Sequence, residues 1–469
     1  MPAPAVDHVH ALPLHRVLGR LIRGGPLGLV EEAGRQAQGA VVRLGLGPFR
    51  PLLLTHPDHL QHVLRDGAEN YARGAAMWNA LGRLTGQGIA GEGPGWRASR
   101  DVLRGGMSSR YLQRTGEAIA SSVEQAVEEL AARARPEQPE DAVTAMTRLV
   151  HRIISPVFFG SRISAAQCDR LGREVATALD SLLWRMAMPF VPHGVPMPGD
   201  RAFLRATRTI NRMLLPAIDT ARRQGGDGAD LMSGLLRGRG PDGRPLTDQH
   251  IGQDIVALFV AGSESSALTL TWAWVVLARH PAVAAGVRRE ADEVLAGGPP
   301  RPGHVRKLVF TRQVMAEVMR LYSMAWAVPR VAGQDDTIGR VPVPAGTTVV
   351  LSPYLTHRLA AFWPDPLRFD PGRFGKQAVR ERHPLAYLPF GDGAHQCVGQ
   401  AFFTMESVLV LATVLSRYDV HVTGDPRPRL AVALPPRGRV GLVLTPRDRS
   451  AQKILDGDVE NPWPAPSPG

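Results

Sequence analysis

Cysteine and lysine are both scarce in this chain of 469 residues. The two cysteines, Cys168 and Cys397, are too few for the disulfide framework of a large secreted protein, although one bridge is formally possible. A reducing compartment therefore fits better, and each cysteine becomes a candidate ligand or nucleophile. The lysines are only Lys307, Lys376 and Lys453, so arginine supplies almost all of the 55 basic residues.

Long apolar runs and dense basic runs are also missing. The longest apolar stretch, 251–277, is interrupted by Asp254 and Glu264, so we expect no transmembrane segment. The N-terminus lacks the apolar core and cleavage site of a signal peptide, which predicts a soluble, cytoplasmic protein. The net charge is +12 without a concentrated Lys/Arg segment, so we expect no nucleic-acid partner and favour an acidic redox protein.

The overall pattern is that of a globular, mainly helical chain. The hydrophobic fraction is 44% and the charged fraction 21%. No internal repeat or linker divides the sequence, so we expect a lead-in at 1–20, one large domain at 21–446 and a disordered tail at 447–469. Thr247 is a candidate N-cap for a helix that runs to Arg279, about 48 Å at 1.5 Å per residue, which is long enough to cross the molecule.

A glycine-rich loop precedes a predicted helix near the C-terminus. Residues 390–399 read Phe-Gly-Asp-Gly-Ala-His-Gln-Cys-Val-Gly, and glycine lets the backbone approach a flat ligand closely. Cys397 lies where the loop meets the helix, and the free N–H groups there stabilise a thiolate and lower its pKa. A thiolate on haem iron favours O–O cleavage. An isolated cysteine is more simply a buried structural residue, and this reading is kept for Cys168.

The spacing Phe-x-x-Gly-x-x-x-Cys-x-Gly resembles the haem-binding loop of the cytochromes P-450. The resemblance implies a mainly α, single-domain cytochrome P-450 fold with small β-sheets and a long central helix over the haem. It also implies that haem b (heme b, iron protoporphyrin IX) is held by Phe390, Gly391, His395, Cys397 and Gly399. Cys397 would ligate the iron, and His395, otherwise a plain polar loop residue, would contact a haem propionate.

Further motifs of the same family occur in the expected order. Glu317 and Arg320 are spaced i,i+3 on one helix face and can form an ion pair. The resemblance implies that they join Arg368, in Pro-Leu-Arg-Phe at 366–369, in a buried network behind the cysteine, although Leu367 replaces the usual glutamate. Such pairs are common on helices, so the order of the motifs carries this interpretation.

Three more residues resemble the family's propionate ligands. Trp96 and Arg100 are four residues apart and share one helix face. Arg330 follows the Glu317–Arg320 helix. In isolation each arginine would be solvated, but together with His395 they can neutralise two carboxylates at the edge of an apolar pocket.

The middle of the long predicted helix reads Ala-Gly-Ser-Glu-Ser-Ser at 261–266. Glycine there costs about 1 kcal/mol relative to alanine, and serine can bond back to the i−4 carbonyl, so a mild kink without function is one interpretation. The segment resembles the family's oxygen-side motif, which implies that Glu264 and Ser265 are catalytic and pass protons toward dioxygen. Ser265 stands where threonine is usual, and it lacks the methyl group that stiffens the rotamer.

Three apolar segments rich in Met and Trp predict the substrate pocket, although core packing is the alternative. They favour an apolar substrate, with a terpenoid preferred to a polyketide. The predicted lining residues are Met77, Trp78, Leu183, Trp184, Ala261, Gly262, Trp326 and Val328.

The resemblance implies a bacterial haem-thiolate monooxygenase that inserts one oxygen atom from dioxygen into an apolar natural product. The Gly-x-Gly-x-x-Gly run at 86–91 does not open a helix directly after a strand, so no nicotinamide domain is expected. Electrons from NAD(P)H would arrive through a ferredoxin reductase and a ferredoxin, docked by arginines such as Arg100, Arg104 and Arg110. The alternatives are a peroxide-driven or oxidative-coupling enzyme, and a haem-binding sensor or carrier without turnover.

Overall fold

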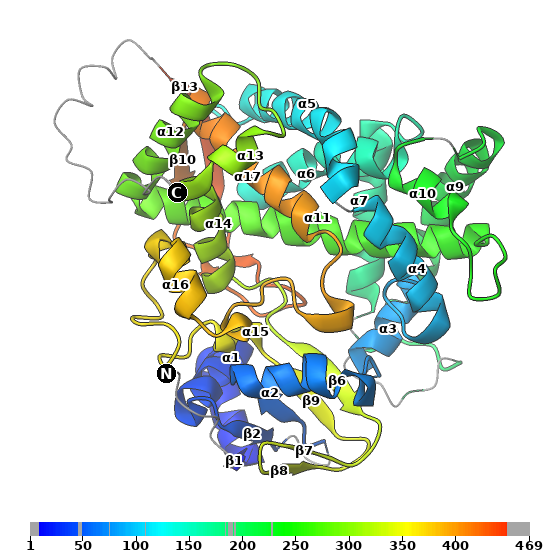
Figure 1. Cartoon of the computed structure of the whole chain (residues 1–469), viewed down its shortest axis with the longest axis vertical. Helices are drawn as coiled ribbons and strands as arrows, with labels where there is room; N and C mark the ends of the chain where they lie inside the picture. Colours follow the sequence, from blue (N-terminus) through cyan, green and yellow to red (C-terminus); the bar gives the residue numbers. More distant parts are fainter. Residues whose placement is uncertain are drawn as a thin grey trace.

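A single long helix organises the molecule. The computed structural model describes residues 9–45, 49–74, 76–107, 109–182, 184–185, 191, 194–226 and 228–447. In Figure 1, α11 (Asp248–Arg279) runs across the middle, with α5 (Ser109–Arg133) and α6 (Ala142–Phe159) above it and the largest sheet below it. The predicted fold class, mainly α with small sheets, is confirmed. The predicted tail at 447–469 lies outside the described residues except for Arg447, and the predicted domain boundaries stay predictions.

The other helices surround α11. Among the described residues they are α1 (Leu14–Ala37), α2 (Pro57–Gln61), α3 (Ala76–Thr85), α4 (Gly93–Gly106), α7 (Ala165–Ser181), α9 (Asp200–Arg223), α10 (Leu231–Arg237), α12 (Pro281–Leu295), α13 (His304–Lys307), α14 (Val309–Leu321), α15 (Pro353–Thr356), α16 (Lys376–Glu381) and α17 (Gln400–Arg417).

The sheets are small. The largest has the strand order β1-β2-β3-β9-β6-β4, and its strands are β1 (Val9–Leu12), β2 (Val41–Leu44), β3 (Leu52–Leu54), β9 (Thr348–Leu351), β6 (Val328–Ala332) and β4 (Tyr71–Ala72). The remaining strands are β5 (Glu140–Asp141), β7 (Asp336–Ile338), β8 (Val341–Val343), β10 (Tyr418–Thr423), β11 (Arg427–Pro428), β12 (Pro436–Arg437) and β13 (Gly441–Pro446).

The pairing of β4 with β6 places two distant parts of the chain side by side. The strands are antiparallel, with Tyr71 opposite Ala332 and Ala72 opposite Val331. Strand β6 carries Arg330, and Arg73 follows β4 directly. This register therefore brings Arg73 and Arg330 to the same region of the sheet.

Helix α11 begins and ends where the sequence predicts. The Thr247 hydroxyl oxygen accepts a hydrogen bond from the His250 backbone N–H at 3.2 Å, which caps the helix, and Arg279 is its last residue before His280 and Pro281. Among the described residues α11 is the one helix long and apolar enough to span a membrane, but most of its apolar window is buried in the protein. It is therefore a core helix.

Candidate active site

The loop that carries Cys397 is held in a closed turn. The Cys397 backbone N–H donates to the Phe390 carbonyl at 2.9 Å. Gly393 has φ +70°, and a Cβ there would lie 2.1 Å from the Leu64 carbonyl oxygen, so only glycine fits. The Arg65 guanidinium donates to both carboxylate oxygens of Asp392, at 2.8 and 2.9 Å. These contacts fix the loop before the polypeptide enters α17.

Cys397 is accessible to solvent, although many protein atoms surround its thiol. Burial raises the pKa of this thiol. The backbone N–H groups of Gly399 and Gln400 and the charge of Arg100 oppose that shift. The stabilising groups predicted at the start of the helix are therefore present. The predicted lowering of the Cys397 pKa is wrong, because the desolvation of the thiol outweighs their effect.

Cys168 is a structural residue, as the sequence predicts. It is fully buried in α7, and its thiol donates to the His151 carbonyl at 3.6 Å. Burial raises the pKa of Cys168 to about 12, which keeps the thiol protonated and unreactive.

A cluster of buried and half-buried basic side chains lies near the cysteine loop. It contains Arg73, Arg100, Arg330 and His395, with Glu92 as the nearby carboxylate, and we call it the cationic cluster. Burial lowers the pKa of Arg73 and of Arg330 to about 10, and the positive charge of Arg330 adds to the effect on Arg73. Three of the four basic residues, Arg100, Arg330 and His395, are predicted by the sequence, and the structure brings them into one region; their contact with haem propionates stays a proposal.

Glu92 ties the cationic cluster together. Its carboxylate accepts the Arg73 backbone N–H at 2.7 Å and lies 3.2 Å from the His395 Nε2 atom. The indole ring of Trp96 packs on the His395 ring, with the centroids 4.2 Å apart. Burial lowers the pKa of His395, and Glu92 partly offsets this shift. Glu92 alone leaves the cluster with excess positive charge.

Several donors of the cationic cluster have no partner within the described part of the chain. They are buried and comprise Arg73 Nε, Arg100 Nε and His395 Nδ1. Unsatisfied buried donors are costly, and cations most of all. A ligand with carboxylates at this place would satisfy both the hydrogen-bond donors and the charge. The residues present therefore fit a haem: the cationic cluster would hold its two propionates, and Cys397 would ligate its iron.

Arg73 was not predicted from the sequence. Its guanidinium donates to the Ile89 carbonyl at 3.2 Å and lies 4.6 Å from the centre of the Trp78 ring. Trp78 in turn donates its indole N–H to the Pro329 carbonyl at 3.2 Å. Trp78 therefore packs against the cationic cluster, and its place in the substrate pocket stays a prediction.

The other residues predicted to line the substrate pocket lie in different environments. Trp326 donates its indole N–H to the Ala431 carbonyl at 2.8 Å and packs against a core cluster with Leu53. Val328 packs against the core of the large sheet. Both residues are only partly buried, so their contacts agree with the core-packing alternative while their place in the substrate pocket stays a prediction. Trp184 is 53% exposed, while Leu183 and the side chain of Met77 lie outside the described residues.

The middle of α11 presents the predicted oxygen-side segment to open space. Ala261 and Glu264 are accessible although they lie at the centre of a core helix. A Cβ on Gly262 would find its nearest neighbour, Phe158 Cζ, 3.9 Å away, so the glycine leaves room. The Ser265 hydroxyl donates to the Ala261 carbonyl at 2.6 Å, the back-bond that serine in a helix allows.

The carboxyl group of Glu264 has the electrostatics of a proton carrier. Burial raises its pKa, and the negative charge of Asp180 on α7 adds to the shift. A glutamic acid with a raised pKa exchanges its proton closer to neutral pH than an exposed one does. This property agrees with the predicted catalytic role, which stays a proposal.

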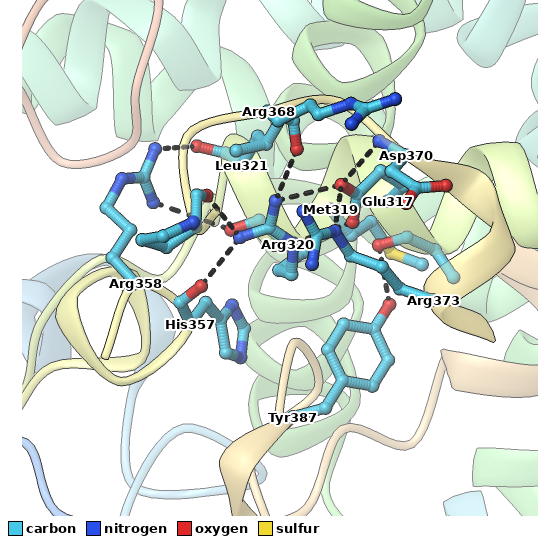
Figure 2. Close-up of polar contacts among 12 residues, drawn as sticks. Glu317, Met319, Arg320, Leu321, His357, Arg358, Arg368, Asp370, Arg373 and Tyr387 are labelled. Carbon is cyan, nitrogen blue, oxygen red and sulfur yellow. Dashed lines mark hydrogen bonds and ion pairs between the residues drawn. The ribbon is translucent and has the colours of Figure 1, made fainter. Parts of the chain in front are cut away.

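The predicted ion pair of Glu317 and Arg320 is fully buried in α14 (Figure 2). Arg320 donates to both carboxylate oxygens of Glu317, at 2.6 and 2.8 Å. Its remaining N–H groups donate to the carbonyls of His357 at 2.8 Å, Pro366 at 2.7 Å and Arg368 at 3.2 Å. This guanidinium therefore binds α14 to the meander that leads toward Cys397.

The predicted third member of this network, the Arg368 side chain, is wrong. The Arg368 side chain is exposed, and only its backbone carbonyl reaches Arg320. Arg373 takes the place, with its Nε 3.5 Å from a Glu317 oxygen that also accepts the Asp370 N–H at 2.9 Å (Figure 2). The sequence contains a pattern that could have identified Arg373, because Pro-Gly-Arg-Phe at 371–374 repeats the Pro-x-Arg-Phe pattern of 366–369 five residues later.

His357 extends the network toward the cysteine loop. Its Nδ1 lies 2.8 Å from the Ser323 hydroxyl, and its Nε2 accepts the Leu388 N–H at 3.0 Å. Full burial and the nearby charge of Arg320 lower the pKa of His357 well below the ordinary value, so the ring is neutral. Leu388 lies two residues before Phe390, so this contact fixes the approach to the loop.

A hollow of about 250 Å³ lies between α14, the cysteine loop and α17. Its walls include Met315, Met319, Phe390 and Phe403. None of the predicted substrate-pocket residues that the structure describes contributes to it. This hollow therefore lies on the α17 side of the loop, apart from the residues predicted to line the substrate pocket.

Comparison with known proteins identifies the class of site. A sequence model of the cytochrome P-450 family matches residues 13–446, so the chain belongs to this family of oxidoreductases, whose members carry haem. The chain is 30% identical over 388 residues to cyclooctat-9-en-7-ol 5-monooxygenase of Streptomyces melanosporofaciens, which covers 82% of this chain and 83% of the relative. It is 29% identical to pentalenene oxygenase of Streptomyces avermitilis, with 83% and 86% covered. The chain is accordingly a cytochrome P-450 monooxygenase.

Solved structures agree on the fold. The crystal structure of the cytochrome P450DA heme domain superposes with a TM-score of 0.84, covering 94% of this chain and 97% of that one. At 24% identity this likeness concerns the fold alone.

Proposed function

We propose that this monooxygenase inserts one oxygen atom from dioxygen into a C–H bond of a cyclic terpenoid, with electrons delivered by a ferredoxin and a ferredoxin reductase that uses NAD(P)H. The observation that carries the haem-thiolate assignment is the accessible Cys397 thiol beside the cationic cluster with its unsatisfied donors. The haem, when bound, supplies the redox-active iron. Cys397 is the proposed iron ligand, and Arg73, Arg100, Arg330 and His395 are the proposed propionate ligands.

Two features support the terpenoid. The relatives named above act on cyclooctat-9-en-7-ol and pentalenene. The open face of α11 contributes Ala261 and Gly262, which offer apolar surface without hydrogen-bond donors. A polycyclic hydrocarbon gains affinity from such a wall mainly by leaving water. Glu264 and Ser265 are the proposed proton carriers at the edge of this surface.

The proposed electron donor is an acidic ferredoxin that docks on α4. Arg97 and Arg104 are exposed on this helix and available to an acidic surface. Arg100 is 8% exposed and belongs to the cationic cluster, so we remove it from the proposed docking residues. The side chain of Arg110 lies outside the described residues. A cytoplasmic location, where ferredoxins are reduced, completes the proposal.

A turnover assay tests the proposal. Holoenzyme is incubated with cyclic terpene hydrocarbons or with macrolides, and with NADPH, ferredoxin and ferredoxin reductase, with hydrogen peroxide alone, or with neither. We expect a terpenoid that carries one added oxygen atom in the ferredoxin arm only. Product with peroxide alone would favour the peroxide-driven alternative, and haem binding without product in any arm would favour a sensor or carrier. Oxidation of macrolides alone would contradict the substrate class.

A further inference from the structure

Two regions that are distant in the sequence, the segment 88–99 and α11, meet at one buried carboxylate, Asp254 of α11. The Ser99 hydroxyl of α4 donates to Asp254 Oδ2 at 2.5 Å, and both side chains are fully buried. The other oxygen, Oδ1, accepts the backbone N–H of Ile89 at 2.7 Å. His250, one turn earlier on α11, places its Nε2 2.7 Å from the Ser99 hydroxyl. We call Ser99, His250, Asp254 and the segment Gly88–Ile89 the Asp254 clamp.

Gly88 shows why the sequence repeats glycine at 86–91. A Cβ on Gly88 would lie 2.0 Å from Asp254 Oδ1 and 3.1 Å from His250 Nε2, so any side chain would displace the carboxylate. Gly86 has φ +65°, and a Cβ there would lie 2.1 Å from the Gln253 side chain. The glycines therefore allow the loop to pack directly on α11, which accounts for a motif that does not serve dinucleotide binding.

The Asp254 clamp connects α11 to the residues of the cationic cluster. Ser99 precedes Arg100 and follows Trp96 by three residues, so the α4 turn that presents both is attached through Ser99. The Ile89 carbonyl accepts the Arg73 guanidinium at 3.2 Å, while the Ile89 N–H is held by Asp254. Glu92, three residues further along the same loop, contacts His395. Each of these connections between α11 and the cationic cluster runs through one or two hydrogen bonds.

We propose that Ser99, His250 and Asp254 are positioning residues for the haem: by fixing α4 and the loop at 86–92 to α11, they hold the cationic cluster in the geometry that retains the haem carboxylates. This inference rests on the haem binding proposed above and assigns the clamp no contact with the haem itself. A buried carboxylate that accepts several short hydrogen bonds is a rigid anchor, and its loss leaves unpaired buried donors.

Protonation of His250 strengthens the clamp. Besides Asp254, His250 faces Ser99 and Gly95 of α4 and Gly88 of the loop, none of which carries charge. The hydrogen bond with Asp254 raises the pKa of His250, against the opposing effect of burial. A raised folded-state pKa means that the stabilisation is complete at acidic pH and is lost as the pH rises through that pKa. The contribution of the Asp254 clamp to haem retention should therefore weaken from mildly acidic to mildly alkaline pH.

The test measures haem loss from the holoenzyme. Excess haem-free myoglobin traps released haem, and the Soret absorbance reports the rate. Ser99→Ala and Asp254→Asn should release haem about ten to a hundred times faster than the wild type, whereas Ser99→Thr, which keeps the hydroxyl, should restore slow release. Ser122→Ala, which removes an exposed hydroxyl bonded only to its own helix, is the matched control and should leave the rate unchanged.

A second comparison separates positioning from general destabilisation. Leu171→Ala opens a cavity in α7, where Leu171 is fully buried, and should lower the melting temperature without accelerating haem loss. His250→Gln should remove the contribution of His250 to the pH dependence of the rate, so the difference in pH profile between wild type and variant reports the clamp. Equal haem-loss rates in wild type and Ser99→Ala, or an unchanged pH dependence in His250→Gln, would overturn the inference while leaving haem binding intact. A wild-type protein that binds no haem would overturn the proposed function and the inference with it.

Discussion

The guanidinium groups of Arg73, Arg100 and Arg330 repel one another in a buried space where Glu92 is the carboxylate that offsets them. The charges of Arg330 and Arg100 both lower the pKa of Arg73. Without an anionic ligand the cationic cluster is therefore strained, and with two carboxylates it becomes satisfied. This difference couples the stability of the cluster to haem binding.

Replacing Arg73 tests this coupling. Arg73→Leu removes one charge-assisted donor for a haem carboxylate, so we expect haem to dissociate about tenfold faster. The haem-free protein should lose little stability, because a source of repulsion goes as well. Haem transfer and urea denaturation measure the two effects. Arg97→Leu, an exposed arginine of α4, serves as the control, and equal rates in both variants would contradict a role for Arg73.

Arg373 and Arg368 form a natural pair of variants. Arg373→Leu leaves Glu317 paired with Arg320, and we expect the free energy of unfolding to fall by about 1.5 kcal/mol through the lost charge interaction and the lost bonds of the Arg373 guanidinium to the Pro364 and Asp365 carbonyls. Arg368→Leu changes an exposed side chain and should stay within about 0.5 kcal/mol of the wild type. Chemical denaturation measures both. The reverse order would restore Arg368 as the member of the network.

Glu264 should give the turnover a recognisable pH dependence. Its raised pKa keeps the carboxyl protonated to higher pH than an ordinary glutamic acid, so proton delivery should weaken as the pH rises. We expect Glu264→Gln to slow product formation by about a hundredfold and to remove this dependence. Asp180→Asn should shift it to lower pH, because the repelling charge is gone. A pH profile unchanged in both variants would exclude Glu264 as the proton carrier.

Single residues differ in how far the sequence reveals them. Cys397 lies in a motif whose spacing is specific, and Glu317 and Arg320 are identified by the order of the motifs. The structure groups Trp96, Arg330 and His395 around Glu92 and Arg73, with Arg100 close to Cys397. Arg73 has no such signal, because its position depends on a two-residue strand pairing with β6. Arg373 lies in a Pro-x-Arg-Phe pattern, but the same pattern five residues earlier pointed to Arg368 instead.

At the scale of elements, α11 was the most predictable part of the molecule. Its length, its Thr247 cap and its end at Arg279 follow from local sequence alone. The hydroxyl of Thr247 holds the N–H of His250. Thr247→Ala should lower the free energy of unfolding by about 1 kcal/mol, and Thr247→Ser should restore it. Urea denaturation measures the free energy of unfolding of both variants. A Thr247→Ala variant as stable as the wild type would show that tertiary packing alone fixes the start of α11.

Contacts between residues that are distant in the sequence could not be predicted from local sequence patterns. Trp326 and Trp78 occur in apolar segments that predict a pocket, yet their indole N–H groups bond to the carbonyls of Ala431 and Pro329. Nothing local distinguishes a tryptophan that lines a cavity from one that anchors two segments. The Asp254 clamp was missed for the same reason, since its members are up to 165 residues apart.

For the whole molecule, the architecture separates a rigid core from a polar inner surface. Helix α11 lies between the large helical core and the sheet that carries Arg330 (Figure 1), and Ala261 and Glu264 at its centre are accessible, as is Cys397. The net charge of +12 adds a basic exterior suited to an acidic electron donor. The central claim, a haem held by a cysteine thiolate, depends on this arrangement as a unit.

That claim is tested most directly by the absorption spectrum of the reduced carbon monoxide complex in wild type and Cys397→His. We expect the wild type to show the red-shifted Soret band of thiolate ligation, because sulfur donates charge to the iron. Cys397→His should bind haem but show the Soret band of imidazole ligation. A wild type without the thiolate band, or a variant that keeps it, would contradict the assignment of Cys397.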